Sequence, residues 1–241
     1  MKQRRQITIA DAIPAHWLDS LGEGNRIGMG FDVATTEKAK SNPSALAVAE
    51  KVGVDFYIRL LVRWKSSDPD IAEAIIRHVL DQIESRRRKA RKLCIDATSE
   101  KFFAKNLKRN LAGVIPVELV VSSESTQYLG EPMNFKVYLG NLYINTIDDG
   151  RLALPDEKWV SDDARQVKRD KGTFIAEIDE DGNHADAFDA CKLALHSLIT
   201  RSGTVEADAA RVGTFGSTGT DGRRFKNPYA NKYTTGAKIN V

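Results

Sequence analysis

The chain has 241 residues, of which 41% are hydrophobic and 29% charged, values that suit one large domain with a sizeable core. Its net charge of +3 is too small to identify a nucleic-acid-binding protein by itself. Because the chain has no apolar run of about 18 residues and no apolar leader after its charged start, we expect neither a membrane span nor a secretory signal. Its two cysteines, Cys94 and Cys191, form no disulfide framework or metal-binding motif, which is typical of reduced thiols in the cytoplasm.

Composition divides the chain into three regions. Residues 1–24 are mixed in character and end in a turn-like GEGN stretch, so we interpret them as an N-terminal arm or linker. Residues 25–201 carry regular hydrophobic patterns and are predicted to form the folded domain. Residues 202–241 are rich in Gly, Thr, Asn, Lys and Arg, a composition that predicts a flexible basic tail.

Three strands are predicted at the start of the domain. The segments RIGMGFDVA (26–34), SALAVAEKV (44–52) and DFYIRLLVRW (55–64) are rich in apolar, β-branched and aromatic residues, as strands are. The short link between the second and third segments indicates a hairpin turn. We therefore expect these three strands to pair in antiparallel fashion.

Helices and strands alternate in the next part of the chain. Apolar residues recur at helical spacing over 71–83, and Pro69 suits the start of that helix. A strand over 92–99, a helix over 100–111 and a strand over 115–121 follow. This strand–helix–strand order indicates parallel strands.

The last part of the domain is predicted to be mainly helical. We expect a helix within 131–150 that closes near Gly150, an amphipathic helix over 156–169, a strand over 172–183 and a final helix over 184–201. The complete order predicts an α/β fold with a central mixed β-sheet, in which three antiparallel strands are followed by parallel ones. Helices are expected on both faces of this sheet.

Three carboxylates stand at the ends of predicted elements: Asp32 and Asp96 each end a strand, and Asp186 lies in the first turn of the last helix. If the two strands are parallel neighbours, their carboxyl ends lie side by side, where α/β sheets gather their sites. Neighbouring acids repel one another, and oxygen ligands without cysteine suit Mg²⁺ or Mn²⁺. Two such ions about 4 Å apart would activate water and stabilise the leaving oxygen of a phosphodiester.

Each acid also has a purely structural interpretation. Asp32 is compatible with a turn, Asp96 with the start of the following helix, and Asp186 with a favourable interaction with the helix dipole. The ordered set points to a site more strongly than any single member does. The chain contains no GxxxxGK[ST] loop and no GxGxxG segment that opens a helix, so we do not expect ATP hydrolysis by a P-loop.

The segments GFDVATT, CIDATS and HADAFDACKLAL, in that order and spacing, resemble the nuclease domain of tailed-phage terminase large subunits, the motors that package DNA. The resemblance covers residues 25–200, and DDGRLALP, QVKRDKGTF and DEDGNHADAFDA bring it closest to the Mu-like prophage branch. It implies a ribonuclease-H-like fold and a metal-dependent endonuclease that cuts double-stranded DNA with little sequence specificity. It also implies an upstream ATPase domain that this chain lacks, a portal and a small terminase subunit as partners, and assembly in the cytoplasm of a bacterial host.

The third motif of this family usually reads His-Asp-Asp-x-x-Asp-Ala, and here Ala185 takes the place of the first Asp. Asp186 matches the acid that the resemblance marks as catalytic, and Asp189 lies about one helical turn further on as a further candidate metal ligand. His184, two residues before Asp186, would orient water, contact the scissile phosphate or assist metal binding. It is equally compatible with an exposed residue beside the helix start.

Basic runs are the candidate DNA contacts. The densest run, RRRKARK (86–92), would track a DNA backbone, although a solvated helix end explains it equally well. The run before the third motif is the better candidate. No zinc finger or recognition-helix signature is present, so we expect contacts to phosphates rather than to bases. The candidates are Lys168, Arg169 and Lys171, and then Arg86, Arg87 and Arg88.

Other functions stay open at this point. GFDVATT resembles the phosphate loop of sugar kinases and actin-like ATPases, but Ala34 replaces its second Gly and no second copy of the fold occurs. A ribonuclease H, a junction resolvase or an integrase-like enzyme would carry the same three acids. A non-catalytic module that docks on a portal or on DNA is the alternative outside enzymes.

Overall fold

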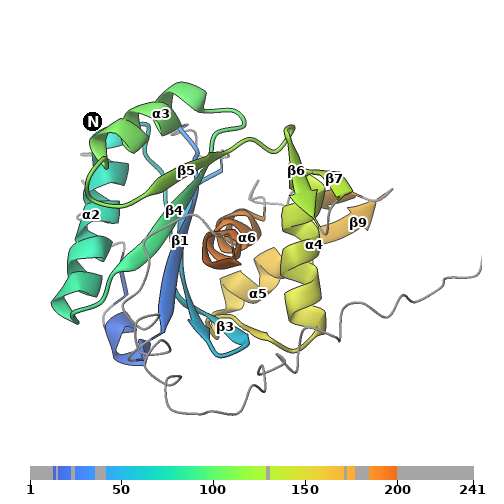
Figure 1. The fold of residues 1–241 in the computed structure, drawn as a ribbon, viewed down its shortest axis with the longest axis horizontal. Helices are drawn as coiled ribbons and strands as arrows, with labels where there is room; N and C mark the ends of the chain where they lie inside the picture. Colours follow the sequence, from blue (N-terminus) through green and yellow to red (C-terminus); the bar gives the residue numbers. More distant parts are fainter. Residues whose placement is uncertain are drawn as a thin grey trace, which may run out of the picture. The chain divides into compact units, whose positions relative to one another are not determined.

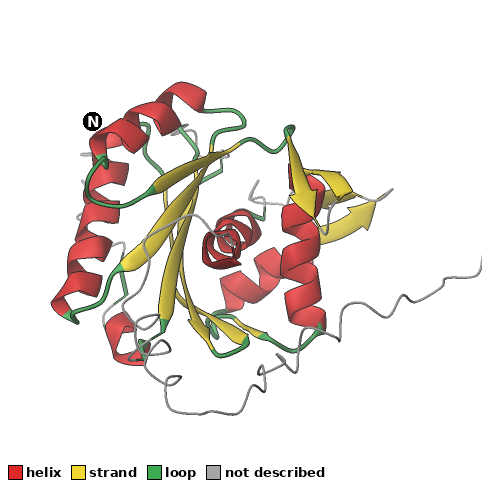
Figure 2. Cartoon of the chain, in the orientation of Figure 1, coloured by secondary structure: helices red, strands yellow, loops and turns green. Residues whose placement is uncertain are grey.

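A six-stranded mixed β-sheet forms the centre of the domain, and helices cover both of its faces (Figures 1 and 2). The computed structural model describes residues 13–14, 16–22, 25–35, 42–128, 131–170, 173–176 and 185–199. All of these belong to one compact unit, residues 1–206. No helix in the described part of the chain has the length and apolarity that a membrane span requires.

The strands of the central sheet lie in the order β5-β4-β1-β2-β3-β8. β1 pairs antiparallel with β2, and β2 with β3, whereas β4 and β5 run parallel to β1 and to each other. This confirms the predicted mixed sheet and its division into antiparallel and parallel parts. The strands are β1 (Arg26–Asp32), β2 (Ser44–Val52), β3 (Asp55–Trp64), β4 (Ala90–Asp96), β5 (Val117–Val120) and β8 (Leu152–Ala153).

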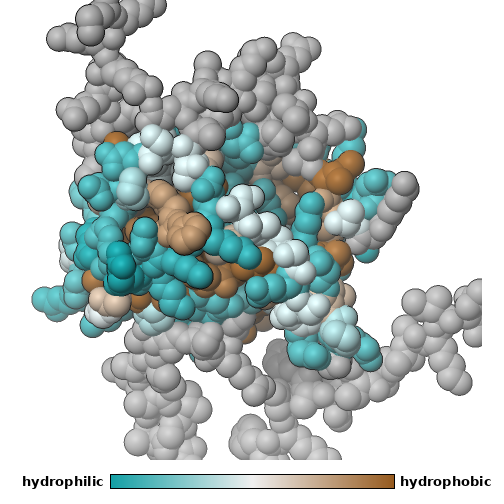
Figure 3. Space-filling view, turned by 90° about the horizontal axis from the view of Figure 1, so that it is seen from above, coloured by the Kyte–Doolittle hydropathy of each residue, from teal (hydrophilic) through white to brown (hydrophobic). Residues whose placement is uncertain are grey.

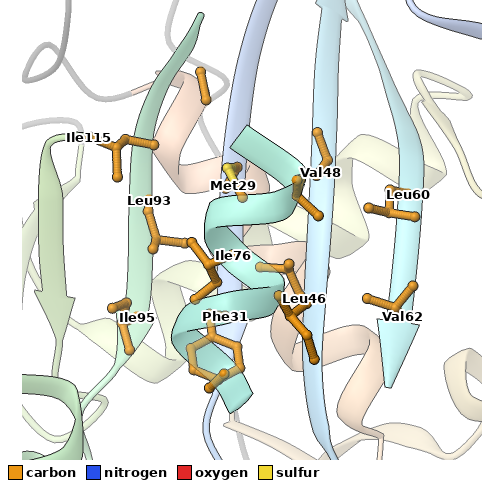
Figure 4. Close-up of a cluster of buried hydrophobic side chains, with 14 of the residues drawn as sticks. Met29, Phe31, Leu46, Val48, Leu60, Val62, Ile76, Leu93, Ile95 and Ile115 are labelled. Atoms are coloured by element: carbon orange, nitrogen blue, oxygen red, sulfur yellow. The ribbon is translucent and has the colours of Figure 1, made fainter. Parts of the chain in front are cut away.

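One face of the sheet carries large apolar side chains that pack against α2 (Pro69–Ser85) (Figure 4). Side chains alternate between the two faces of a strand, so Met29 and Phe31 of β1 point toward this helix. The helix begins as predicted, because Asp68 caps it by accepting a hydrogen bond from the Asp70 amide at 2.9 Å. α3 (Lys101–Asn110) lies beside α2 at the end of the sheet toward which β1 and β4 run (Figure 1).

The opposite face of the sheet is lined by very small residues, and α6 (Asp186–Ile199) packs directly on it. These residues are glycines of β1 and alanines of β2, which stand opposite each other in the register. A Cβ atom at Gly30 would lie 2.2 Å from the Ala190 carbonyl oxygen and 2.3 Å from the Ala194 nitrogen. Only glycine therefore permits this approach of helix and strand. The small residues are Gly28, Gly30, Ala45, Ala47 and Ala49.

Further elements surround α6. α4 (Phe135–Asp148) and α5 (Lys158–Arg165) both contact it, and Phe174 stands against α4, where a Cβ at Gly140 would meet its ring at 2.0 Å. The two small hairpins and the N-terminal 3-10 helix are β6 (Ser125–Tyr128) with β7 (Glu131–Asn134), β9 (Val167–Asp170) with β10 (Thr173–Ala176), and η1 (Trp17–Ser20).

The prediction of one helix over 156–169 is wrong at its end. The helix stops at Arg165, and residues 167–170 form β9. Lys and Arg are good helix formers and favour the longer helix locally. Pairing with β10, in which Arg169 stands opposite Phe174, provides cross-strand contacts that override this preference. The predicted strand over 172–183 is present as β10 in its described part.

The proposed boundary at residue 24 stays a prediction, but the segment before it contributes to the core. Ile13 and Trp17 are buried and belong to the same apolar cluster as α2. The Trp17 indole donates a hydrogen bond to Gln82 of α2 at 2.8 Å. The predicted tail, residues 202–241, lies outside the described residues.

We predict that Gly30→Ala destabilises the protein by about 1–3 kcal/mol, because the added methyl group meets the backbone of α6 and forces helix and strand apart. Thermal or urea unfolding measures the loss. Ala153→Val is the control, since it adds methyl groups at an exposed strand position. Equal stability of Gly30→Ala and wild type would show that α6 does not need this close contact.

Candidate active site

Asp32 and Asp96 end the neighbouring parallel strands β1 and β4, as predicted. The register pairs Phe31 with Ile95, so the two aspartates follow side by side. Gly30 shares a face of β1 with Asp32, and the close contact between Gly30 and α6 brings the first turns of that helix to Asp32.

Carboxylates from the strand ends and from α6 act on one another electrostatically. Burial first, and then the negative charges of Asp189, Asp96 and Asp186, raise the pKa of Asp32 well above its usual range, against the opposing effect of Lys192. The structure thus gathers all four predicted acids into one electrostatic unit. Mutual repulsion of this kind is what a bound cation relieves.

Asp186 is buried, and its Oδ2 atom has no hydrogen-bond partner. Burial raises the pKa of Asp186 to about 8, with further contributions from Asp163 and Asp189 and opposition from Arg63 and Lys65. A buried carboxylate oxygen without a donor is costly. A divalent cation would satisfy it, so the donor set fits a hard metal ion.

No three of these acids, however, bring their carboxylate oxygens as close together as the ligands of one bound ion within the described part of the chain. Among the described residues, three or more metal-ligating atoms come within 4.8 Å of one another only at Cys94, Glu118 and His196. For one ion to bind, the carboxylates would have to move closer together, either around the cation alone or around a cation that is also bound to a DNA phosphate.

Asp96 and Asp189 already have partners on the protein. Asp96 Oδ1 accepts a hydrogen bond from the Thr98 amide at 2.7 Å, and this bond engages one of its two oxygens. The alternative role of Asp96 at the start of the next helix is not found, because Glu100 is the N-cap residue of α3. Asp189 forms an ion pair with Lys192, which is itself buried. Ala185, which stands where the resemblance leads us to expect an aspartate, is fully buried.

Asp163, on α5, was not predicted as a site residue, although it holds the start of α6. Its Oδ2 atom accepts hydrogen bonds from the amides of Ala187 at 2.8 Å and Phe188 at 3.2 Å. A side chain from another helix thus caps the α6 N-terminus. Burial raises the pKa of Asp163 to about 6, against these two hydrogen bonds.

Two signals in the sequence could have identified the missed residues. Asp163 lies three and four positions after Val160 and Trp159, which places it on the buried face of its helix. Lys192 lies three positions after Asp189, within reach of an ion pair on the same helix.

The predicted DNA contacts fall in two places. Lys168 and Arg169 lie on β9, whose partner strand carries Phe174 against Phe188 of α6, with ring centroids 6.3 Å apart. The first basic run follows α2, at the opposite end of β4 from Asp96.

The first basic run is also partly engaged within the protein. Arg86 pairs with Asp19 at 2.8 Å, and Arg88 donates to the carbonyls of Gly22 and Asn25. Because this run lies at the far end of β4 from Asp96, Arg86, Arg87 and Arg88 stand outside the candidate site, and their contact with DNA stays a prediction. His184 and Lys171 lie outside the described residues.

A second polar cluster lies on the same face of the sheet. Glu118 accepts a hydrogen bond from the buried Lys92 ammonium group, and its other oxygen lies 3.0 Å from His196 Nε2. The second ring nitrogen of His196, Nδ1, lies 3.2 Å from the Tyr138 hydroxyl oxygen. The hydrogen bond from His196 lowers the pKa of Glu118 to about 2, although burial of the carboxylate acts in the opposite direction. Cys94 completes a set of donors that zinc also uses, but Lys92 already neutralises the carboxylate. The network joins β4, β5, α4 and α6.

The chain belongs to the terminase RNaseH-like domain family (Terminase_6C), whose profile matches residues 29–198. Its fold is similar to the large terminase nuclease of the thermophilic phage G20c, with a TM-score of 0.53, 17% identity, and coverage of 72% of this chain and 82% of that one. It is also similar to the large terminase nuclease domain of Thermus phage P74-26, with a TM-score of 0.51, 15% identity, and coverage of 76% and 84%. The comparison with curated proteins returns no match.

We predict that Asp186→Asn stabilises the metal-free protein at pH 8 by at least about 1 kcal/mol. The folded-state pKa of about 8 exceeds the ordinary value of about 3.9. Between about pH 4 and pH 8 the unfolded chain releases the Asp186 proton more readily than the folded protein does. The free energy of unfolding therefore falls as the pH rises through this range, and the asparagine side chain, which carries no such proton, removes this loss. Urea unfolding at pH 5 and pH 8 in EDTA measures it, and an unchanged pH dependence in the variant would contradict the assignment.

We predict that Asp163→Ala destabilises the protein by about 1–2 kcal/mol, because the amides of Ala187 and Phe188 lose their acceptor. Asp163→Asn keeps an acceptor oxygen and should retain most of the stability. Hydrogen exchange at these two amides, beside thermal unfolding, measures the cap directly. Equal protection in Asp163→Ala and wild type would show that Asp163 does not hold the helix start.

Proposed function

We propose that this domain is a metal-dependent endonuclease that cuts double-stranded DNA during phage genome packaging. Family membership supports a nuclease, and one observation carries the chemistry: four carboxylates act on one another at the ends of β1 and β4 and the start of α6. The excess negative charge suits two Mg²⁺ or Mn²⁺ ions. When bound, the ions would stabilise the charge that develops on a scissile phosphate.

The residues of the chain would divide this work by their positions. Asp32 and Asp96, fixed at two strand ends, would hold the ions on one side, and Asp186 and Asp189 would complete the shell from the helix. Lys192 balances the charge of Asp189, and Asp163 positions the helix start without touching the substrate. His184 would orient water or the phosphate, as the sequence indicates.

The wider setting is part of the same proposal. We propose that the domain acts beside a terminase ATPase domain, a portal and a small terminase subunit in the host cytoplasm, and that it is closest to the Mu-like branch. The segments DDGRLALP and QVKRDKGTF support that branch. Lys168 and Arg169 are proposed phosphate contacts because β10, the partner strand of β9, packs close to α6. Lys171 is proposed from the sequence, as part of the same basic run.

We predict that the protein nicks and then linearises supercoiled plasmid with Mg²⁺ or Mn²⁺ but not with EDTA. Asp96→Asn should lower the rate by at least about 100-fold, because metal-assisted stabilisation of the transition state is worth several kcal/mol. Asp81→Asn, which removes an exposed acid on α2, is the matched control.

Equal cutting by Asp96→Asn and the control would refute the site assignment. Matched duplex, RNA–DNA hybrid and four-way substrates distinguish a packaging nuclease from a ribonuclease H or a resolvase. Tight binding to a partner without cutting under any metal would instead favour a docking module.

A further inference from the structure

α3 carries an exposed basic face at the end of the sheet where the acids gather. The helix starts five residues after Asp96 and contains no acidic residue. Figure 3 views the molecule from above relative to Figure 1, and its described surface is mostly hydrophilic with small hydrophobic patches. The cations of the helix, Lys101, Lys105, Lys108 and Arg109, are all exposed.

The charges of these four cations are not paired with acids, unlike those of several other described basic groups. None of the four forms an ion pair within the part of the chain that the structure describes. Arg59 pairs with Glu50, and Arg77 with Glu73. Unpaired cations on one helix face keep their full charge available to an external polyanion.

An exposed aromatic ring interrupts this face. Phe102 is 86% exposed, although the next residue, Phe103, turns inward and contacts Phe31 at a centroid distance of 6.5 Å. Lys105 lies three positions after Phe102 and four after Lys101, so the three side chains are neighbours on the helix surface. An apolar ring beside two ammonium groups matches a surface that alternates phosphates with sugars and base edges.

We propose that the Lys101–Phe102–Lys105 face of α3 is a duplex-DNA contact that holds the substrate across the strand ends. The inference rests on the proposed nuclease function and adds a binding surface on the side of the acids away from α6. The lysines contact phosphates, and Phe102 contacts sugars and base edges in the groove between them. Because α3 is about 15 Å long and duplex DNA presents one charge about every 1.7 Å of its axis, several phosphates lie within its reach.

Binding of a fluorescein-labelled 30-base-pair duplex, followed by anisotropy in EDTA between 50 and 200 mM salt, tests this surface without cleavage. Lys101→Ala/Lys105→Ala should weaken binding and reduce the slope of log affinity against log salt by about 1.8, or about 0.9 for each lost phosphate contact. Phe102→Ala should weaken binding by about ten-fold without changing the slope, because it removes an apolar contact and no charge. Lys51→Ala/Lys89→Ala is the charge-matched control, since Lys51 stands opposite Arg26 at the start of β1 and Lys89 directly precedes β4, and it should leave the slope nearly unchanged.

The proposal is overturned if the α3 double variant keeps the wild-type slope, if the control pair reduces it equally, or if Phe102→Ala binds duplex as wild type does. A loss in Phe102→Ala seen only with single-stranded DNA also overturns the duplex contact. With Mg²⁺, the α3 variants should need more DNA for half-maximal cutting but keep the rate at saturation. Failure of the proposed nuclease function would give a different result from failure of this DNA contact. The wild-type protein would then not cut DNA, but the α3 variants would still reduce the salt dependence of DNA binding.

Discussion

The close contact between α6 and the small-residue face of the sheet is the constraint on which the rest of the structure depends. Glycine at position 30 lets the helix backbone approach the strand to within a distance that any Cβ would prevent. The alanines of β2 extend this flat surface beside it. Since Asp32 shares this face of β1 at the carboxyl end, the same contact that packs the helix also brings its acids to Asp32.

This arrangement concentrates negative charge, and the protein balances it only in part. Lys192 pairs with Asp189, and Arg63 and Lys65 lower the pKa of Asp186, yet the pKa values of Asp32, Asp163 and Asp186 all remain raised. A domain built only for stability would replace such acids with neutral residues. Their retention is consistent with a site that exchanges its own repulsion for the attraction of divalent cations.

The sequence predicted the sheet because its strands are long, apolar and bounded by clear turns. It predicted that Asp32 and Asp96 each end a strand, but the side-by-side position of these two strands was only a condition of the predicted metal site, and the sheet order meets this condition. The sequence did not predict contacts between segments that are distant along the chain. Asp163 accepts a hydrogen bond from an α6 amide 24 residues away. Residues 167–170 form a strand because they pair with β10. The element order already separated the first basic run, at the start of β4, from Asp96 at its end.

Anomalous diffraction from crystals soaked in Mn²⁺ with a short DNA duplex tests the central claim most directly. The duplex is included because its phosphate oxygens would provide metal ligands in addition to the separated carboxylates. Manganese peaks should lie among Asp32, Asp96 and Asp186, with these carboxylates closer together than in the ion-free protein. Manganese only at Cys94, Glu118 and His196, or no manganese beside the strand ends with DNA bound there, would contradict this claim.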